Sequence, residues 1–206
     1  MIDAALIVID LQNDFCPGGS LAVAEGDQIV PVVNSLAPQF RRVVATKDWH
    51  PANHVSFASQ HEGHEPMETI EVDGRDQILW PDHCVQATRG AEFHPEFDTR
   101  PIDLIVHKGT NPGLDSYSAF FENDHKTPTG LEGYIKSLDI STVYIVGLAS
   151  DVCVYFSALD ARKVGLETYL ITDGTRGVDQ PEGSVERTRE DMKQKGVRFV
   201  SSREVR

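Results

Sequence analysis

The stretch VGLASDVCVYFSALDARKVG, residues 146–165, reads as the end of a buried strand, a tight turn and a helix. The apolar run TVYIVG at 142–147 leads into it. Beyond the turn, apolar side chains recur at helical spacing, at Val152, Tyr155, Phe156 and Leu159. A strand that passes through a short turn into a helix is the repeating unit of α/β proteins. The stretch therefore predicts a fold in which such units follow one another along the chain.

Five other short runs are nearly continuous in apolar residues, as in strands that are buried on both faces of a parallel sheet. Together with the first run they lie at 5–10, 42–48, 103–108, 142–147, 167–173 and 197–200. Helical periodicity falls between them, at 29–40, 131–138, 152–165 and 181–195. The pattern predicts a three-layer, Rossmann-like α/β fold, with a mainly parallel six-stranded sheet and helices on both faces. We expect residues 1–206 to form a single domain.

The charge balance is acidic, with 32 Asp and Glu against 19 Lys and Arg and a net charge of −13. Nucleic acids and anionic membranes attract concentrated positive charge, so neither is expected as a partner. No apolar run approaches the roughly 20 residues that span a bilayer, and the opening MIDAALIVID lacks the positive charge of a signal peptide. The three cysteines show no CxxC spacing, which favours a reducing, cytoplasmic location over a disulfide framework.

One long segment, residues 49–101, breaks the alternation of strands and helices. It is rich in His, Pro, Gly and acidic residues, shows no convincing run of helix or strand, and holds six of the eight histidines. An insertion of this length inside a compact domain is usually functional. We expect it to contribute to a metal site and a substrate pocket.

Ionisable residues stand at the ends of four predicted strands, at Asp10, Asp48, Lys108 and Asp173. The carboxyl ends of parallel strands meet at one edge of a sheet, which is where ligands bind in open α/β folds. A single aspartate there commonly caps a turn. The combination of Asp10, Lys108 and a cysteine at a helix start, Cys153, favours a catalytic group.

Cys153 falls in the first turn of a predicted helix, where free N–H groups and the helix dipole stabilise a thiolate or an oxyanion. Ser150 or Asp151 is placed to cap this helix. The alternative is a buried structural cysteine. Asp10 is a candidate general base, metal ligand or turn residue, and Lys108 would keep a carboxylate ionised or lower the pKa of a neighbouring thiol.

A metal site is indicated by the segment KDWHPANH, which begins at Lys47. Asp48 and His50 share one side of an extended segment, and one further histidine, either His54 or His83, would complete three protein ligands. The spacing alone does not choose between the two. Such a set suits Zn, and also Fe or Mn; the alternative is that these histidines only satisfy hydrogen bonds of the loop.

Aromatic residues flank both candidate groups. Phe15 and Trp80 are near in sequence to the catalytic and metal segments, so they are candidates for the walls of a pocket that holds a flat ring. Trp49 and Tyr117 are also near. Ordinary core packing is the alternative for all four.

Five motifs, in this order along nearly the whole chain, resemble the nicotinamidases, a family of the isochorismatase-like cysteine hydrolases. They are VIDLQNDFCPGGSLAV (8–23), TKDWHPANHVSFAS (46–59), LWPDHCVQATRGAEFH (79–94), HKGTNPGLDSYSAF (107–120) and IVGLASDVCVYFSALDA (145–161). The resemblance implies an isochorismatase-like fold. It also implies a divalent metal, most simply zinc, with Fe and Mn as alternatives.

The resemblance assigns roles to particular residues of this chain. It implies a catalytic triad of Asp10, Lys108 and Cys153, and metal ligation by Asp48, His50 and His83 in place of His54. It implies a cis peptide between Leu148 and Ala149, and an oxyanion hole formed by the amides of Ala149 and Cys153. It implies a substrate pocket built from Phe15, Trp80, Tyr117 and Leu148.

The activity that the resemblance implies is hydrolysis of nicotinamide to nicotinate and ammonia through a cysteine thioester, a step of NAD salvage, with pyrazinamide as a further substrate. The substrate is then a small molecule, and the chain is a monomer or a homo-oligomer. Two alternatives stay open. One is a related enzyme acting on an isochorismate ether, a carbamoyl group or another amide; the other is a non-catalytic binding protein on the same fold.

Overall fold

The computed structural model describes residues 1–205, and its centre is a six-stranded sheet in the order β5-β2-β1-β6-β7-β8. All five strand pairings in this sheet are parallel. The strands are β1 (Ile2–Ile9), β2 (Phe40–Asp48), β5 (Leu104–Lys108), β6 (Thr142–Leu148), β7 (Glu167–Arg176) and β8 (Arg198–Val200). Each coincides with one of the six predicted runs, so the predicted sheet is confirmed.

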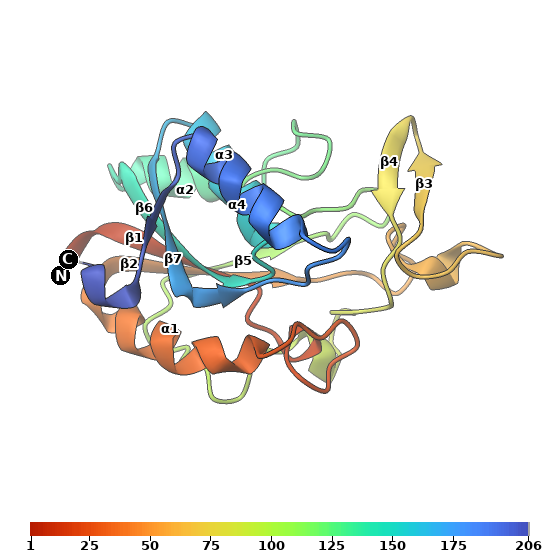
Figure 1. The fold of residues 1–206 in the computed structure, drawn as a ribbon, viewed down its shortest axis with the longest axis horizontal. Helices are drawn as coiled ribbons and strands as arrows, with labels where there is room; N and C mark the ends of the chain where they lie inside the picture. The colour runs from red at the N-terminus through yellow and green to blue at the C-terminus, as the bar shows by residue number, and fades with distance from the viewer. Residues whose placement is uncertain (206) are drawn as a thin grey trace.

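Helices cover both faces of the sheet, as Figure 1 shows. One face carries α1 (Val30–Leu36), and the other carries α2 (Leu131–Ser137), α3 (Cys153–Lys163) and α4 (Ser184–Gln194). Side chains of β1 alternate between the two faces: Leu6 and Val8 join the core beneath α1, and Ile7 joins the core beneath α2 and α3. The three predicted layers are thus present. No helix among residues 1–205 is long and apolar enough to cross a membrane.

Two of the predicted helix boundaries were wrong. Phe40 does not continue α1 but begins β2, with its ring 5.2 Å from that of Tyr144. Pro38 supplies no N–H to continue an α-helix, and the chain turns through a 3₁₀ segment, Ala37–Gln39, before the strand. At the other end of the chain α4 begins at Ser184 instead of Pro181, after Gly183 in the left-handed region.

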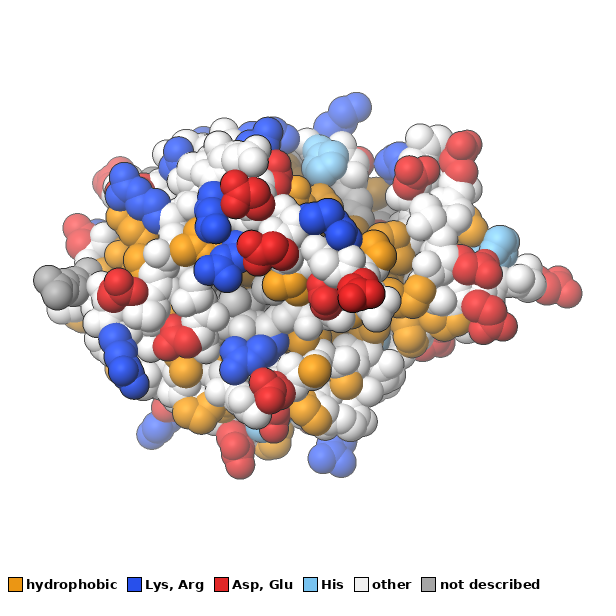
Figure 2. Space-filling model, viewed as in Figure 1, with side chains coloured by type: hydrophobic (Ala, Val, Ile, Leu, Met, Phe, Trp, Pro, Cys, Tyr) orange, Lys and Arg blue, Asp and Glu red, His pale blue; other side chains and the backbone are white. Residues whose placement is uncertain are grey.

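The insertion at 49–101 holds a β-hairpin, so the prediction that it lacks strands was also wrong. β3 (Thr69–Val72) and β4 (Arg75–Ile78) pair antiparallel and project from the sheet domain (Figure 1). The turn between them is Asp73-Gly74, with φ of 51° and 74°. An Asp-Gly pair in this conformation is a strong short-range signal for a hairpin, and it was present in the sequence. Acidic side chains gather on this projecting end of the molecule (Figure 2).

The register of the sheet brings three of the four predicted strand ends together. Asp48 and Lys108 are direct partners between β2 and β5, and Ile9, just before Asp10, pairs with Gly147 of β6. The fourth, Asp173, lies within β7, which continues to Arg176. Its carboxylate accepts hydrogen bonds from the amide and hydroxyl of Ser202. Asp173 therefore holds the segment after β8 in place and lies outside the site.

A glycine is required where β6 passes β1. Gly147 has φ of 120°, and a Cβ atom there would overlap the backbone of Ile9. Gly147→Ala should therefore lower the free energy of unfolding, measured by urea denaturation, by about 2–4 kcal/mol. The control is Gly133→Ala in α2, where the added methyl group meets no atom within 4 Å and should stabilise by up to about 1 kcal/mol. Equal effects of the two substitutions would contradict the required close approach.

Candidate active site

Lys108 is the centre of the buried polar cluster at the carboxyl edge of the sheet. Its ammonium is fully buried and lies 2.8 Å from Asp10 Oδ2. It also donates a hydrogen bond to Asp48 Oδ1, and another to the Ser116 carbonyl at 3.1 Å. Cys153 Sγ is 3.5 Å away. The three predicted catalytic side chains, from the residue after β1, the end of β5 and the start of α3, therefore meet at the Lys108 ammonium.

Two buried side chains that hold this cluster were missed from the sequence. Thr46 Oγ1 donates to Asp10 Oδ1 at 2.6 Å, which leaves Oδ2 facing Lys108 and the thiol. Gln12 fixes the backbone of Asp48 from both sides, donating to its carbonyl at 2.8 Å and accepting from its amide at 2.9 Å. The role of Thr46 could have been inferred from its spacing, because it lies two residues before Asp48 and so on the same face of β2.

Burial and charge set the protonation of the catalytic groups. Burial raises the pKa of Asp10 to about 6, opposed by the Lys108 ammonium, so this carboxyl is mostly ionised at neutral pH. Burial also raises the pKa of the Cys153 thiol well above its ordinary value, and Lys108 only partly offsets that effect. The expected stabilised thiolate is thus not the resting state. Burial and charge together favour a thiol beside an ionised carboxylate, and this pair requires proton transfer to Asp10 when the sulfur reacts.

The turn before Cys153 presents two free amides. The peptide between Leu148 and Ala149 is cis, as the resemblance implied. Within residues 1–205, neither the Ala149 amide nor the Cys153 amide donates a hydrogen bond. Two unpaired N–H groups beside the sulfur are donors that a developing oxyanion needs.

Asp151 does not cap α3, contrary to the sequence-based expectation, and Ser150 does not either. The Asp151 carboxylate instead accepts hydrogen bonds from the amides of Val178 and Asp179, both at 2.9 Å, and from the hydroxyl of Ser184. It therefore ties the turn that precedes Cys153 to the segment that precedes α4. No local pattern indicates this long-range role, because the donors lie 27 to 33 residues away.

Three side chains converge as a metal-binding group would. Nε2 of His50 and Nε2 of His83 lie 3.7 and 3.8 Å from Asp48 Oδ2, and all three side chains are buried. Each imidazole donates its Nδ1–H to a backbone carbonyl, His50 to Gly109 at 2.9 Å and His83 to Pro81 at 2.7 Å. These bonds fix the tautomer in which Nε2 is free to bind a metal.

The charges of the cluster also fit a cation. Burial raises the pKa of Asp48, but Lys108 and His50 outweigh it and hold that pKa below its ordinary value. Burial, together with His50, lowers the pKa of His83 to about 4, so this imidazole is neutral. An ionised Asp48 carboxylate with two buried imidazole nitrogens beside its Oδ2 is a donor set that suits a divalent cation.

His54 occupies a different position from His83. Its Nδ1 lies 2.7 Å from Ser56 Oγ and its ring centroid 4.1 Å from that of His50. It belongs to a second possible ligand group with His50 and Asp115, whose ligand atoms lie within 4.8 Å of one another. Asp115 is engaged by the Gln77 side chain and the Ser116 amide. The group around Asp48 keeps both imidazole Nε2 atoms without a hydrogen-bond partner, so it suits a metal better.

A small cavity opens onto the Cys153 side chain and the Asp48–His83 pair. Phe15 and Trp80 line it, and the Phe15 ring lies 5.5 Å from that of His83. Ala149, Val152 and Val178 complete its apolar walls, with Leu21.

The other two predicted pocket residues lie outside this lining. Tyr117 is behind Trp80, whose Nε1–H donates to the tyrosine oxygen at 3.2 Å. Leu148 is fully buried in the core on the α1 side of the sheet, next to Gly26. The structure therefore brings Phe15 and Trp80 to the cavity directly, Tyr117 contacts it only through Trp80, and Leu148 is not part of its lining.

Comparison with known proteins gives a consistent result over the full length. The Isochorismatase domain family matches residues 4–204. A nicotinamidase of Acinetobacter baylyi is 50% identical over 203 residues, which cover 98% of this chain and 94% of that protein. A solved nicotinamidase and pyrazinamidase of Acinetobacter baumanii superposes with a TM-score of 0.96 at 50% identity, covering 99% and 98% of the two chains. The pyrazinamidase of Pyrococcus horikoshii, solved with zinc, gives 0.80 at 37% identity, covering 97% and 99%.

The Asp151 contacts predict a large effect of its removal on stability. Asp151→Ala leaves two amides and a hydroxyl without their acceptor in a buried place, and should lower the free energy of unfolding by about 2–4 kcal/mol. The matched control is Asp124→Ala, since Asp124 also accepts hydrogen bonds from two amides and a hydroxyl, but in an exposed loop where water replaces it. Urea denaturation should show a markedly smaller loss for the control. Similar losses would contradict a special role for the buried carboxylate.

Proposed function

This chain belongs to the nicotinamidase family of isochorismatase domain proteins, and we propose that it hydrolyses nicotinamide to nicotinate and ammonia. The observation that carries the proposal is the buried Lys108 ammonium, in contact with Asp10, Asp48 and Cys153 at once. It joins a thiol–carboxylate pair suited to amide hydrolysis to a candidate metal group suited to holding a ring nitrogen.

The first half of the reaction forms a thioester. The Cys153 sulfur bonds to the carboxamide carbon while the thiol proton passes to Asp10, and the carbonyl oxygen takes the negative charge. The amides of Ala149 and Cys153 then donate to that oxygen. When the tetrahedral species collapses, the C–N bond breaks and Asp10 returns its proton to the departing nitrogen, which leaves as ammonia.

The second half consumes water. Asp10 accepts a proton from the water that attacks the thioester carbon, the C–S bond breaks, and the proton returns to the sulfur of Cys153. Lys108 keeps Asp10 ionised before each of these transfers, because the ammonium favours the charged form of the carboxylate. Thr46 holds the other carboxylate oxygen and so fixes the direction of Oδ2.

The metal group is proposed to consist of Asp48, His50 and His83. These three residues would hold a divalent ion, which would supply a Lewis acid for the pyridine nitrogen of the substrate. We propose zinc, supported by the zinc-bound pyrazinamidase relative, with Fe and Mn as the alternatives that metal analysis of the purified protein distinguishes.

The flat ring of the substrate is proposed to lie between Phe15 and Trp80. The apolar walls of the cavity and the ring of Phe15, close to His83, support this placement. Tyr117 would fix the orientation of the Trp80 indole through their hydrogen bond, and Leu148 would support the floor of the cavity.

The cell context is part of the proposal. The three cysteines are all unpaired, which supports a reducing, cytoplasmic location. Nicotinate production there would feed NAD salvage. Pyrazinamide is proposed as a further substrate, because it has the same carboxamide on a ring with a nitrogen at the corresponding position.

A substrate panel tests the activity. Ammonia release should be rapid with nicotinamide and pyrazinamide, and at least about tenfold slower in kcat/KM with benzamide, which lacks the ring nitrogen. Cys153→Ala should lower kcat by at least about 10³-fold without loss of folded structure, because no thioester forms. A kcat/KM for benzamide equal to that for nicotinamide would contradict the proposed recognition of the ring nitrogen by the metal group. Hydrolysis retained by Cys153→Ala would overturn the mechanism, and no release from any of these amides would overturn the function.

Removal of the metal tests its role. Chelation, and separately His83→Ala, should remove one bound divalent ion per chain and raise KM for nicotinamide more than they lower kcat, because the ring loses its anchor. The control is His94→Ala, since His94 lies outside the ligand group and should keep the metal and the KM of the parent protein. Metal content is read by elemental analysis. An unchanged KM in the metal-free protein would exclude the anchoring role.

A further inference from the structure

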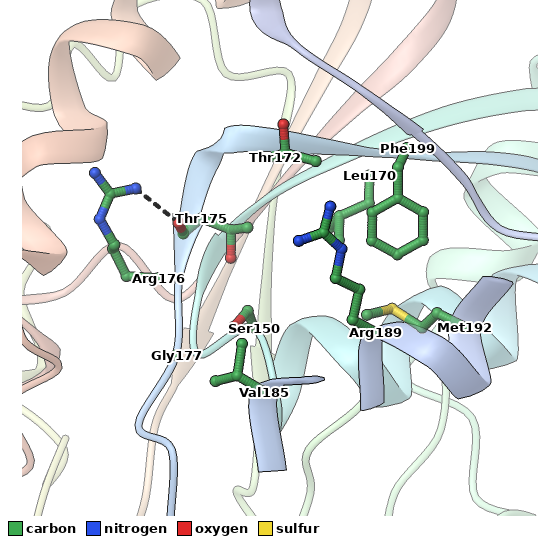
Figure 3. A pocket seen from close by; sticks show the side chains of 10 residues that line it. All are labelled: Ser150, Leu170, Thr172, Thr175, Arg176, Gly177, Val185, Arg189, Met192 and Phe199. Carbon is green, nitrogen blue, oxygen red and sulfur yellow. Dashed lines mark hydrogen bonds between the residues drawn. The ribbon is translucent and has the colours of Figure 1, made fainter. Parts of the chain in front are cut away.

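A second cavity lies on the other side of the nucleophile turn, between β7, β8 and α4 (Figure 3). Its volume is about 200 Å³, and it shares no lining residue with the cavity at Cys153. Leu170, Met192 and Phe199 form an apolar bed on one side. The hydroxyls of Ser150 and Thr175 lie on the other. The proposed reaction uses none of these side chains.

The cavity exists because of two local features. β8 ends at Val200, so the last part of β7 has no strand on its outer side. Gly177, directly after β7, packs closely on the Ser150 hydroxyl and on Val185, and any side chain there would overlap them. The opening is thus at the carboxyl edge of the sheet, where open α/β folds bind ligands.

Arg189 gives the cavity an unpaired positive charge. Its guanidinium lies 5.5 Å from the centre of the Phe199 ring. Within the described chain it has no hydrogen bond or ion pair, and no acidic side chain lines the cavity. The other arginine of the lining, Arg176, points away from it (Figure 3) and lies 3.6 Å from Glu25. A free cation over an apolar bed attracts a small anion that carries an apolar group.

The two hydroxyls add polar partners at the inner end. Ser150 Oγ makes no hydrogen bond among residues 1–205. Thr175 Oγ1 donates to the Gly147 carbonyl at 2.7 Å, which leaves its lone pairs free to accept. The cavity therefore offers a charge at the mouth, an apolar bed and hydrogen-bonding groups at the base.

We propose that this cavity is a second binding site, for a small carboxylate on a single ring. The ring would pack on Leu170, Met192 and Phe199, and the carboxylate would pair with Arg189. The size is suitable, because a cavity of about 150 Å³ is enough for benzene. An aromatic carboxylate is also the class of product that the proposed reaction releases, but binding at this site does not rest on that reaction.

The second cavity is connected to the turn before Cys153 through Ser150. Ser150 donates its amide to the Arg176 carbonyl at 2.7 Å and directly follows Ala149, whose amide faces the proposed oxyanion. A ligand that contacts Ser150 would therefore bias the turn that carries Cys153. A change in the rate of hydrolysis on binding is the consequence, and only this part rests on the proposed function.

Methionine NMR tests binding without any activity. The chain has three methionines; Met192 is 1% exposed in the cavity, whereas Met1 and Met67 are exposed at 96% and 41%. With ¹³C-methyl methionine and benzoate as the probe, the Met192 signal should shift in a saturable way while the other two stay. Benzamide, which has the same ring but no charge, should bind there at least about tenfold more weakly.

Two variants identify the binding group. Arg189→Gln should weaken benzoate binding about tenfold and keep the basal ammonia release of the parent. Arg187→Gln is the matched control, because Arg187 lies on the same helix outside the cavity and bonds the carbonyls of Glu182 and Pro181 instead. It should bind benzoate as the parent does. Thermal melting checks that both variants are folded.

Several results would overturn the proposal. The first is the absence of a saturable Met192 shift, and the second is equal benzoate affinity in Arg189→Gln. A shift abolished by Trp80→Ala but kept in Arg189→Gln would locate benzoate in the catalytic cavity. A Met192 signal that moves with protein concentration alone would show that a second copy of the chain covers the cavity. A Met192 shift with unchanged ammonia release would leave the site standing and reject only its coupling to the turn.

Discussion

The structure of the site depends on one buried charge. An ammonium with no exposure to water, such as that of Lys108, is stable only where anionic and polar partners replace its hydration. Asp10, Asp48 and the Ser116 carbonyl are those partners. They come from two different strands and a loop, so the sheet must place all of them correctly before the charge can be buried. Removing either carboxylate or the carbonyl takes a hydrogen-bond partner from a fully buried ammonium, and for that reason the three positions depend on one another.

The same constraint links the two halves of the proposed chemistry. Asp48 uses Oδ1 for Lys108 and presents Oδ2 to the imidazoles of His50 and His83. Gln12 fixes the backbone of Asp48 and so the position from which its carboxylate extends. A change in charge at the metal group would then change the electrostatic potential at Lys108, and through Lys108 at Asp10 and the thiol. In the proposed reaction, nucleophile activation and ring binding would therefore be coupled electrostatically over a few ångströms, with no moving element required.

Around this cluster, most of the fold could be predicted, and the errors in the main sheet and its helices lie at the ends of elements. The six strands were evident because strands buried on both faces must be apolar throughout. The helix end near Phe40 was misplaced because the chain passes through a 3₁₀ segment, Ala37–Gln39, before β2. The start of α4 was misplaced because a turn that ends at the left-handed Gly183 precedes it. Asp173 looked like a strand-end ligand, but β7 runs three residues further and Ser202 takes its carboxylate.

The sequence by itself determined the sheet, the approach of Asp10, Lys108 and Cys153 to one edge, and the family to which the chain belongs. These follow from hydrophobic pattern, residue type and motif, which are local properties. The tertiary structure alone decided which oxygen of Asp48 faces which partner, that Asp151 ties the nucleophile turn to the segment before α4, and that burial leaves the sulfur as a thiol. Each of these features depends on groups that are distant in sequence and on the exclusion of water from the site. A local sequence pattern contains neither kind of information.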